Sequence, residues 1–179
     1  MKMKVDRMDH LKHTDLQEME DLINERSEAS LEMKGRWTAV ERDPETGEIL
    51  SETTSENVIT EDGADAIADM LAGTAVTDFT YIAVGNGPAA GDSESVTQSS
   101  LSAEQARKQD SSPSTSDDAS GQKVTWSAVF GPGTCVVTEF GLLNDGTSGI
   151  LLSYNIPAIA KDADNAELTL TYELIVNEG

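Results

Sequence analysis

The chain contains little of several residue types that define common protein classes. Its 179 residues include one cysteine, two histidines and 4% aromatic residues. The single cysteine, Cys135, cannot form a disulfide within the chain, so no internal cross-link holds the fold together. The histidines, His10 and His13, supply fewer ligands than a zinc site normally uses. These shortages argue against a disulfide-rich domain and against a zinc enzyme.

Basic residues are also scarce. The chain has 12 Lys and Arg residues against 33 Asp and Glu residues, which gives a formal net charge of −21. Such a surface repels phosphate backbones and anionic lipids, so we expect neither nucleic acid nor membrane as a partner. No apolar run approaches the ~20 residues that cross a bilayer, and the first residues lack the apolar core of a signal peptide.

The charge is distributed unevenly along the chain. Residues 1–42 contain eight basic and ten acidic residues, a net charge of −2, whereas residues 43–179 contain four basic and 23 acidic residues, a net charge of −19. A nearly balanced arm therefore precedes a strongly acidic body. Such an arm can lie against an acidic neighbour without the repulsion that two copies of the body feel.

The N-terminal arm, residues 1–33, is predicted to contain an amphipathic helix. Residues 4–32 include no Gly or Pro, and their apolar residues fall within one arc at 100° per residue, interrupted by Lys12 and Asp15. This stripe packs either on the chain's own domain or on another chain as an anchor or oligomerisation surface. A membrane-surface role is disfavoured because the polar face is not basic. The stripe consists of Val5, Met8, Leu11, Leu16, Met19, Leu22 and Ile23.

Residues 34–179 form the predicted acidic body, in which strand patterns dominate. A hairpin is expected where residues 36–42 and 48–55 flank the turn Asp43–Gly47. Thr60 is the expected N-cap of a short packing helix over residues 61–72, with an apolar face made of Ala64, Ile67, Ala68 and Leu71. A buried strand over residues 79–84 follows, closed by a Gly-Asn-Gly turn that is expected to need positive φ.

The C-terminal part carries the strongest β pattern. Alternating apolar residues predict strands over 123–130, 135–143, 150–156 and 168–176. Before them, residues 88–122 are predicted to be a long surface loop, with residues 101–108 as either a short helix or the start of a strand. About seven strands joined by tight turns predict a mainly β fold, an antiparallel β-sandwich of the jelly-roll-like or immunoglobulin-like type.

The search for catalytic and metal-binding residues yields weak candidates. Cys135 is interpreted as a small buried residue of a strand. Two strand carboxylates, Glu139 and Glu173, could pair for acid–base chemistry, but in a chain with 33 acidic residues such pairs are expected by chance. An EF-hand starting at residue 162 is rejected because its sixth position lacks Gly, which leaves a loose cation site among Asp162, Asp164 and Glu167. No catalytic site and no cofactor is predicted.

Several motifs nevertheless resemble a known class of proteins. The first stretches are KGRWTAVERDPETGE at residues 34–48, NVITEDG at 57–63 and IADMLAG at 67–73. The most specific is FTYIAVGNG at residues 79–87, followed by Leu101, Glu104 and Arg107 in an L-x-x-E-x-x-R pattern. TEFGLLN at residues 138–144 and GILLSYN at 149–155 complete the series. In order, over residues 34–176, these stretches resemble the structural proteins of tailed viruses.

The resemblance implies an assembly role in a tail fibre, a baseplate or a capsid decoration, with no catalytic residues to transfer. The acidic excess resembles proteins of haloarchaea and their viruses, so the implied environment is a virion assembled at high salt. We therefore expect a homo-oligomer that contacts other virion proteins on the particle exterior, as a decoration or vertex turret or as part of the tail. The alternative is a receptor- or carbohydrate-binding module used in host adsorption, for which the exposed loop over residues 88–122 is the candidate surface.

Overall fold

The structure is a computed structural model that describes residues 31–118 and 121–178. Within it, Met33–Val176 form one compact unit. The predicted N-terminal stripe between Val5 and Ile23 lies outside the described residues, as do His10 and His13. The prediction of an amphipathic arm therefore stays a prediction, and the fold below is that of the acidic body.

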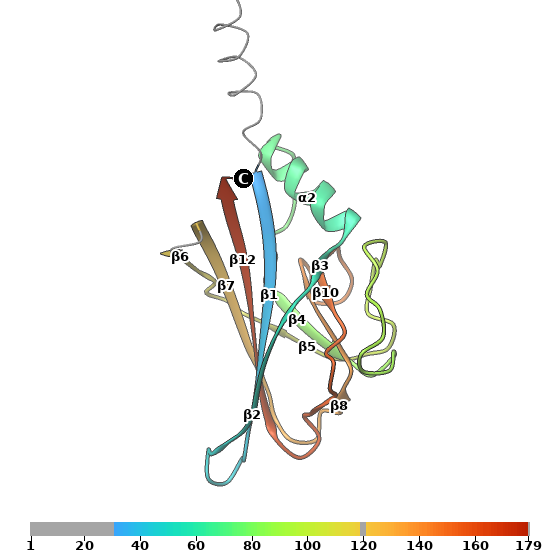
Figure 1. The fold of residues 1–179 in the computed structure, drawn as a ribbon. Coiled ribbons are helices and arrows are strands. Elements are labelled where there is room, and N and C mark those ends of the chain that lie inside the picture. The colour runs from blue at the N-terminus through green and yellow to red at the C-terminus, as the bar shows by residue number, and fades with distance from the viewer. Residues whose placement is uncertain (1–30, 119–120, 179) are drawn as a thin grey trace, which may run out of the picture. The chain divides into compact units, whose positions relative to one another are not determined.

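Two antiparallel five-stranded sheets dominate the described part of the chain (Figure 1). Sheet A has the order β2-β1-β12-β7-β6, formed by β2 (Ile49–Glu56), β1 (Leu31–Arg42), β12 (Glu167–Glu178), β7 (Gly121–Phe130) and β6 (Ser114–Asp118). Sheet B has the order β3-β10-β9-β4-β5, formed by β3 (Val58–Ile59), β10 (Leu151–Asn155), β9 (Glu139–Leu143), β4 (Tyr81–Gly85) and β5 (Glu104–Gln109). A small third sheet pairs β8 (Val136–Val137) with β11 (Lys161–Asp162).

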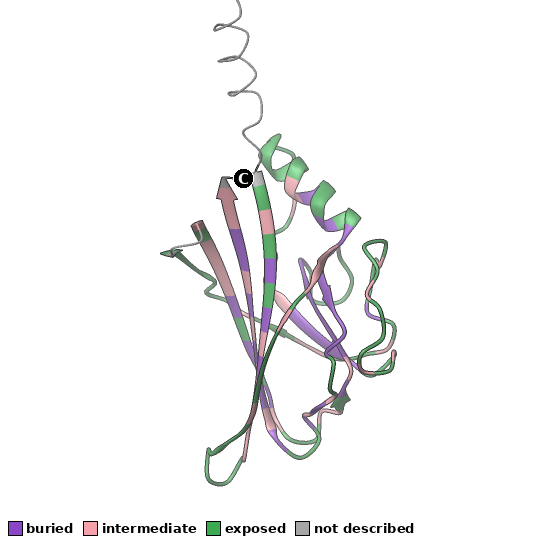
Figure 2. Ribbon diagram, viewed as in Figure 1, coloured by how far each residue is buried: buried purple, intermediate pink, exposed green. Residues whose placement is uncertain are grey.

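The main core lies between the two large sheets. In sheet A, β7 buries alternate residues from Trp126 to Phe130 and β12 buries alternate residues from Leu168 to Leu174, and those between them are exposed or half-buried (Figure 2). Trp37 of β1 is fully buried, and its ring meets that of Phe140 of β9 edge-on at 5.0 Å between centroids. Its indole Nε1 donates to Ser153 Oγ of β10 at 2.9 Å. The predicted antiparallel β-sandwich with one short helix is thus confirmed.

The predicted hairpin at the start of the body is also confirmed. β1 and β2 pair antiparallel, with Arg36 opposite Glu56 and Arg42 opposite Ile49. The turn between them has Gly47 at φ 72°, and Asp43 Oδ1 accepts the backbone N–H groups of Glu45 and Thr46 at 2.9 and 2.8 Å. These two amide donors hold the pKa of Asp43 below its usual value.

Helix α2 (Glu61–Leu71) begins as the sequence predicts but packs through a different face. Thr60 is its N-cap, with its Oγ accepting Gly63 N–H at 3.1 Å. The buried residues are Gly63 and Ala66, whereas Leu71 is 80% exposed. The predicted packing face of Ala64, Ile67, Ala68 and Leu71 is therefore wrong except for the partly buried Ile67. The helix lies so close to β10 that only residues with little or no side chain fit at the contact.

The predicted surface loop over residues 88–122 contains two strands. β5 pairs with β4, with Ile82 opposite Lys108, and β6 pairs with β7, with Ser114 opposite Thr125. Both are edge strands, at the ends of sheet B and sheet A. Of the two alternatives for residues 101–108, the strand is correct. Neither strand shows an apolar alternation because edge strands with polar side chains bury little of either face.

One predicted strand is divided between two sheets. Residues 135–143 were expected to form a single strand, but β8 belongs to the small sheet and β9 to sheet B. Between them, the backbone N–H of Thr138 donates to Gly85 O at 2.9 Å. Cys135 lies before β8 and is only partly buried, although it packs against the main core. Burial, together with the charge of Asp164, raises the pKa of its thiol, which keeps it protonated and unreactive.

Candidate functional site

The face of sheet B that points away from the main core is covered by the segment between β4 and β5, residues 86–103. We call this segment the strap. Beneath it lies a second, smaller apolar cluster, made of Ala83, Leu101, Leu143, Leu151, Tyr154 and Ile156. A connection of this length in a compact domain is uncommon and is typically functional or held in place by specific contacts. Here two glutamate side chains hold it.

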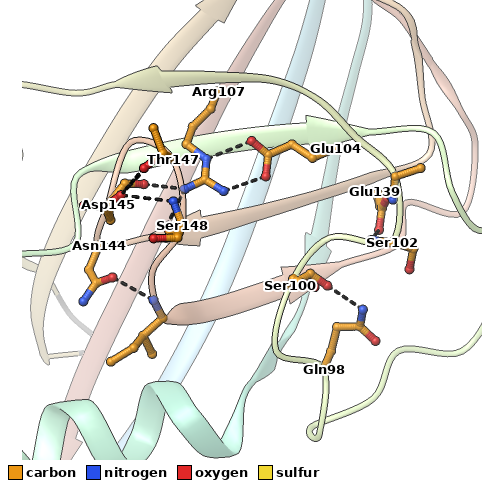
Figure 3. A network of polar contacts seen from close by, with 12 residues as sticks. Gln98, Ser100, Ser102, Glu104, Arg107, Glu139, Asn144, Asp145, Thr147 and Ser148 are labelled. Atoms are coloured by element: carbon orange, nitrogen blue, oxygen red, sulfur yellow. Dashed lines mark hydrogen bonds and ion pairs between the residues drawn. The ribbon is translucent and has the colours of Figure 1, made fainter.

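Glu139 makes the first set of contacts, and Figure 3 shows it beside Ser102. It is the first residue of β9 and is fully buried. Its Oε1 accepts the backbone N–H groups of Ala103 at 2.7 Å and Gly87 at 3.3 Å. Its Oε2 accepts the N–H of Ser102 at 2.8 Å and the hydroxyl of Tyr154 at 2.8 Å. One carboxylate therefore joins both ends of the strap to sheet B. We call this arrangement the Glu139 clamp.

The clamp satisfies the condition under which a buried carboxylate is tolerated. A charged group removed from water is stable only when its lone pairs are occupied by hydrogen bonds or an ion pair. Each oxygen of Glu139 accepts two donors. With these positions occupied, Glu139 holds the strap in place on sheet B.

Tyr154 lies in the same buried environment as Glu139. Burial raises the pKa of its hydroxyl, and the hydrogen bond to Glu139 raises it further, because a carboxylate beside the phenol disfavours the phenolate. Tyr154 therefore remains a donor to Glu139 over the whole physiological range. Its ring belongs to the cluster beneath the strap.

The Gly-Asn-Gly turn after β4 requires glycine because it passes close to the Glu139 clamp. The expected positive φ is absent at Gly85 and at Gly87. Instead, a Cβ on Gly85 would lie 2.6 Å from Ala103 O and 2.6 Å from Glu139 Oε1, and one on Gly87 would lie 2.9 Å from the same oxygen. The prediction of a positive-φ turn is therefore wrong. Glycine is required because the backbone passes too close to the strap and the carboxylate for a side chain.

Glu94 forms the second set of contacts, in the middle of the strap. Its Oε1 accepts Ile156 N–H at 2.8 Å and Asn155 Nδ2 at 2.8 Å, and its Oε2 accepts Val58 N–H at 3.2 Å. Burial raises the pKa of Glu94, while the two backbone donors lower it by less. Nearby, Val96 O accepts the N–H of Glu61, the first residue of α2. The strap is therefore fixed to β3, β10 and α2.

Arg107 of β5 organises the neighbouring turn between β9 and β10 (Figure 3). Its guanidinium pairs with both carboxylate oxygens of Glu104, at 2.8 and 2.6 Å. It also donates to Ser148 O at 2.7 Å and to the carbonyl of Asp145. A planar group with several fixed donors suits this double role. The L-x-x-E-x-x-R pattern of the sequence thus places one ion pair that holds a turn of another hairpin.

Asp145 and Asn144 shape that turn from within. Asp145 Oδ1 accepts Thr147 N–H at 2.9 Å and Ser148 N–H at 3.0 Å, and these donors hold the pKa of Asp145 below its usual value. Asn144 Oδ1 accepts Ile150 N–H at 2.7 Å. Gly149 has φ 107°, which a residue with a side chain adopts at a cost in strain. In the E-x-G-L-L-N stretch, the first residue, Glu139, therefore forms the clamp, and the last residue, Asn144, stabilises the turn between β9 and β10.

The other sequence candidates do not gather into a site. Glu139 lies in sheet B, whereas Glu173 lies in sheet A, where Lys123 Nζ is 2.7 Å from its Oε1 and Arg36 Nε donates to its Oε2 at 2.8 Å. Burial alone would raise the pKa of Glu173, but hydrogen bonds from these two cations lower it below its usual value. Because the two glutamates contact different partners in different sheets, they form no acid–base pair.

The loose cation site predicted at residues 162–167 is not formed. Asp162 Oδ1 instead accepts the backbone N–H of Asn165 at 3.1 Å, which closes a local turn. Among residues 31–118 and 121–178, no group of three acidic, histidine or cysteine side chains is arranged to hold a metal ion, so Asp162, Asp164 and Glu167 do not provide one. In the same two ranges, no helix has the length and apolar character needed to cross a membrane.

Comparison of the chain with protein-family models, with curated proteins and with solved structures returned no match.

By residue type alone, Glu139 is one of 33 acidic residues. The signal that could have identified it is its position inside an otherwise apolar strand, because an isolated acid in such a run is buried and must have donors. The donors themselves are backbone amides of the strap, which no sequence pattern marks. Gly85, Glu104, Arg107 and Asn144 belong to the motifs of the resemblance, and only the structure shows what each of them contacts.

The buried tyrosines predict a loss of stability at alkaline pH. Burial raises the pKa of Tyr172 from 10.0 to about 12. A folded-state pKa above the unfolded value means that the stabilisation is complete below pH 10 and is lost as the pH rises towards 12. A shift of this size corresponds to about 3 kcal/mol. Urea denaturation at stepwise increasing pH should show the decline, and tyrosinate absorbance should appear together with unfolding.

The matched variant for this measurement is Tyr172→Phe, which removes the titrating hydroxyl and keeps the ring in the core. Its stability should fall less steeply above pH 10 than that of the wild type. Equal slopes for the two proteins would show that Tyr172 does not contribute to the alkaline transition.

Proposed function

We propose that the chain is a non-enzymatic structural component of a tailed-virus particle that assembles as a symmetric oligomer on the particle exterior. This proposal is supported by the contacts that the motif residues make in the structure. Gly85, Gly87 and Glu139 hold the strap, and Glu104 with Arg107 holds the turn between β9 and β10. The residues that carry the resemblance to virion proteins are thus residues that determine the fold.

A motif of this kind marks a shared scaffold. In an enzyme, motif residues converge on the place where a substrate binds, with lone pairs or protons directed into it. In this chain they converge on backbone amides and carbonyls of two connecting segments. In this chain the motif residues therefore hold sheet B and its connecting segments in place, which supports an assembly role.

The charge of the body supports assembly at high salt. Most basic side chains of the described residues are already engaged: Arg36 and Lys123 with Glu173, Lys161 with Glu41, and Arg107 with Glu104. The remaining surface is acidic, and copies of the body repel each other in dilute buffer. At molar salt the Debye length falls to ~3 Å, so the repulsion is largely screened.

Assembly is therefore expected to depend on salt. Light scattering of the full chain should give an oligomeric mass in molar KCl and a smaller mass, approaching that of the monomer, in dilute buffer. A chain starting at Lys34 should associate less in both conditions if the arm is the anchor. Oligomers that persist unchanged in dilute buffer would contradict the salt-dependent assembly.

The direct test of the proposed function is the composition of the particle. Mass spectrometry of purified virions should detect this chain at a copy number that fits a symmetric assembly. Antibody labelling of intact particles would then separate a capsid decoration or vertex turret from a tail-fibre or baseplate component. Particles that lack the chain would contradict the proposal.

The second candidate function, a receptor- or carbohydrate-binding module, depends on an exposed recognition surface. Stacking against a sugar needs an exposed aromatic side chain. Trp37 and Tyr172 are fully buried, and Trp126 is 6% exposed. In addition, part of the loop proposed for binding is the edge strand β6, paired with β7. These observations favour the assembly role over the binding module.

A further inference from the structure

Helix α2 presents an apolar face that the sandwich does not cover. Gly63 and Ala66 face β10, but the apolar residues continue around the helix to Ala64, Ala68 and Leu71. Leu71 is 80% exposed, the highest value among the large hydrophobic side chains of the described residues, and the adjacent Met70 is 41% exposed. Figure 2 shows exposed positions along much of α2. We call the surface of Ala64, Ala68 and Leu71 the α2 face.

Acidic side chains border the α2 face. The helix contains Glu61, Asp62, Asp65 and Asp69, and its sequence includes no Lys or Arg. A partner for this surface needs a narrow apolar stripe to cover Leu71 and basic groups to meet the acids. In a protein with a net charge of −21, few segments of the chain itself meet both needs.

Residues 1–13 meet both. They contain Lys2, Lys4, Arg7 and Lys12 against two acidic residues, a net charge of +2, whereas residues 14–33 contain one basic and seven acidic residues, a net charge of −6. Val5, Met8 and Leu11 recur every three residues, the spacing of one helix face. The arm's net charge of −4 is thus the sum of a basic end and an acidic remainder. Lys12, which interrupts the predicted stripe, supplies a cation beside it.

Chain geometry favours a neighbouring copy as the source of this segment. The sequence predicts one helix over residues 4–32 without Gly or Pro, and at 1.5 Å per residue Leu11 lies about 30 Å from Glu32 along such a helix. The molecule's own α2 is close to the start of β1, because Asn57, four residues before α2, lies against Gly35. An α2 of 11 residues spans about 16 Å. Measured along such a helix, residues 1–13 are thus farther from Glu32 than α2 is long.

We propose that residues 1–13 of one copy dock on the α2 face of a neighbouring copy, with Met8 and Leu11 covering Leu71 and Lys4, Arg7 and Lys12 meeting the acids of α2. This inference rests on the proposed function, and it identifies the contact that joins neighbouring copies in the assembly. Because two different surfaces meet, the contact is heterologous, and repeated contacts close into a ring when the rotation between neighbours allows it. The second half of the stripe, from Leu16 to Ile23, remains for contacts between arms.

The test uses the full chain in molar KCl. Leu71→Asp places a charge in the centre of the α2 face, and Leu50→Asp is the matched control, since Leu50 is 59% exposed on the β1–β2 hairpin. Sedimentation over a concentration series should show association weakened at least tenfold by Leu71→Asp and unchanged by Leu50→Asp. Association unaffected by Leu71→Asp, or a wild type that is monomeric at every concentration, would overturn the proposal. Circular dichroism checks that both variants fold, as expected at exposed positions.

Cysteine pairing then identifies the source of the segment. In a Cys135→Ser background, one copy carries Met8→Cys and a second copy, with a tag of different size, carries Leu71→Cys. Oxidation of the mixture should give a disulfide between the two sizes of chain. A chain that carries both substitutions and cross-links only to itself when diluted would overturn docking on a neighbour, and no cross-link in either experiment would overturn the contact. Detection of the chain in virions is measured separately, so failure of the joint and failure of the proposed function are distinguishable.

Discussion

Replacing Glu139 with alanine is expected to lower the free energy of unfolding by about 3 kcal/mol. The substitution leaves the N–H groups of Ser102 and Ala103 and the hydroxyl of Tyr154 without their acceptor, at a position where Glu139 is fully buried. It also opens a cavity beneath the strap. Urea denaturation in molar KCl measures the change through the shift of the midpoint at constant slope.

Glu139→Gln tests the chemistry of the clamp more narrowly. Glutamine has the same shape but one acceptor oxygen, whereas each oxygen of Glu139 accepts two donors. Either orientation of the amide places its NH₂ group against two donors, so a loss of about 2 kcal/mol is expected.

The matched control removes a carboxylate from the surface. Glu48→Gln changes the net charge equally, at an exposed residue next to the β1–β2 turn, and should leave stability unchanged or slightly raised because acidic repulsion falls. Equal effects of Glu139→Gln and Glu48→Gln would mean that the hydrogen bonds of the clamp do not stabilise the fold.

Gly63→Ala is expected to destabilise the protein by about 2 kcal/mol or more, opposite in sign to its usual effect in a helix. At an unconstrained helical position this substitution stabilises by about 1 kcal/mol. Here the added Cβ would lie 2.6 Å from Leu152 Cα and 2.9 Å from the carbonyl oxygens of Leu151 and Leu152. These atoms are backbone of a buried strand and cannot move aside without disturbing sheet B.

The control for Gly63→Ala is Gly131→Ala. Gly131 lies after β7, a Cβ there would meet nothing within 4 Å, and its φ is not positive. Its stability should change by less than about 0.5 kcal/mol. Thermal unfolding of both variants compares the two positions, and a stabilised Gly63→Ala protein would show that α2 does not press against β10 as closely as the structure has it.

The close contact at Gly63 also explains why the helix face was mispredicted. Helical periodicity places the larger apolar residues Ile67 and Leu71 towards the core. The actual contact selects Gly63 and Ala66, because a helix that lies directly on a strand leaves no room for larger side chains. The periodicity correctly predicted an apolar arc on the helix, but this arc is wider than the surface that packs on the sandwich. The structure shows which part of the arc the sandwich covers. The uncovered part is the α2 face.

Hydrophobic alternation by itself determined the class of fold and most of the interior strands. β7 and β12 have the predicted buried residues, including Trp126 and Tyr172, because a strand that covers a core must place apolar residues on every second position. The β1–β2 turn and the N-cap Thr60 were equally predictable, since both depend on contacts within a few residues. The uneven distribution of charge between residues 1–42 and 43–179 also follows from the sequence alone.

Only the tertiary structure decided the rest, and the physical reason is the range of the interactions. The edge strands β5 and β6 form because a neighbouring strand offers its backbone, which leaves no apolar pattern in their own sequence. Glu139 meets donors from residues 36 and 37 positions away in the chain, and Gly85 is a glycine because a distant carboxylate and the strap pass beside it. A local pattern records which residues prefer the interior, whereas the partners that a buried charge or a missing side chain requires are set by the packing of both sheets.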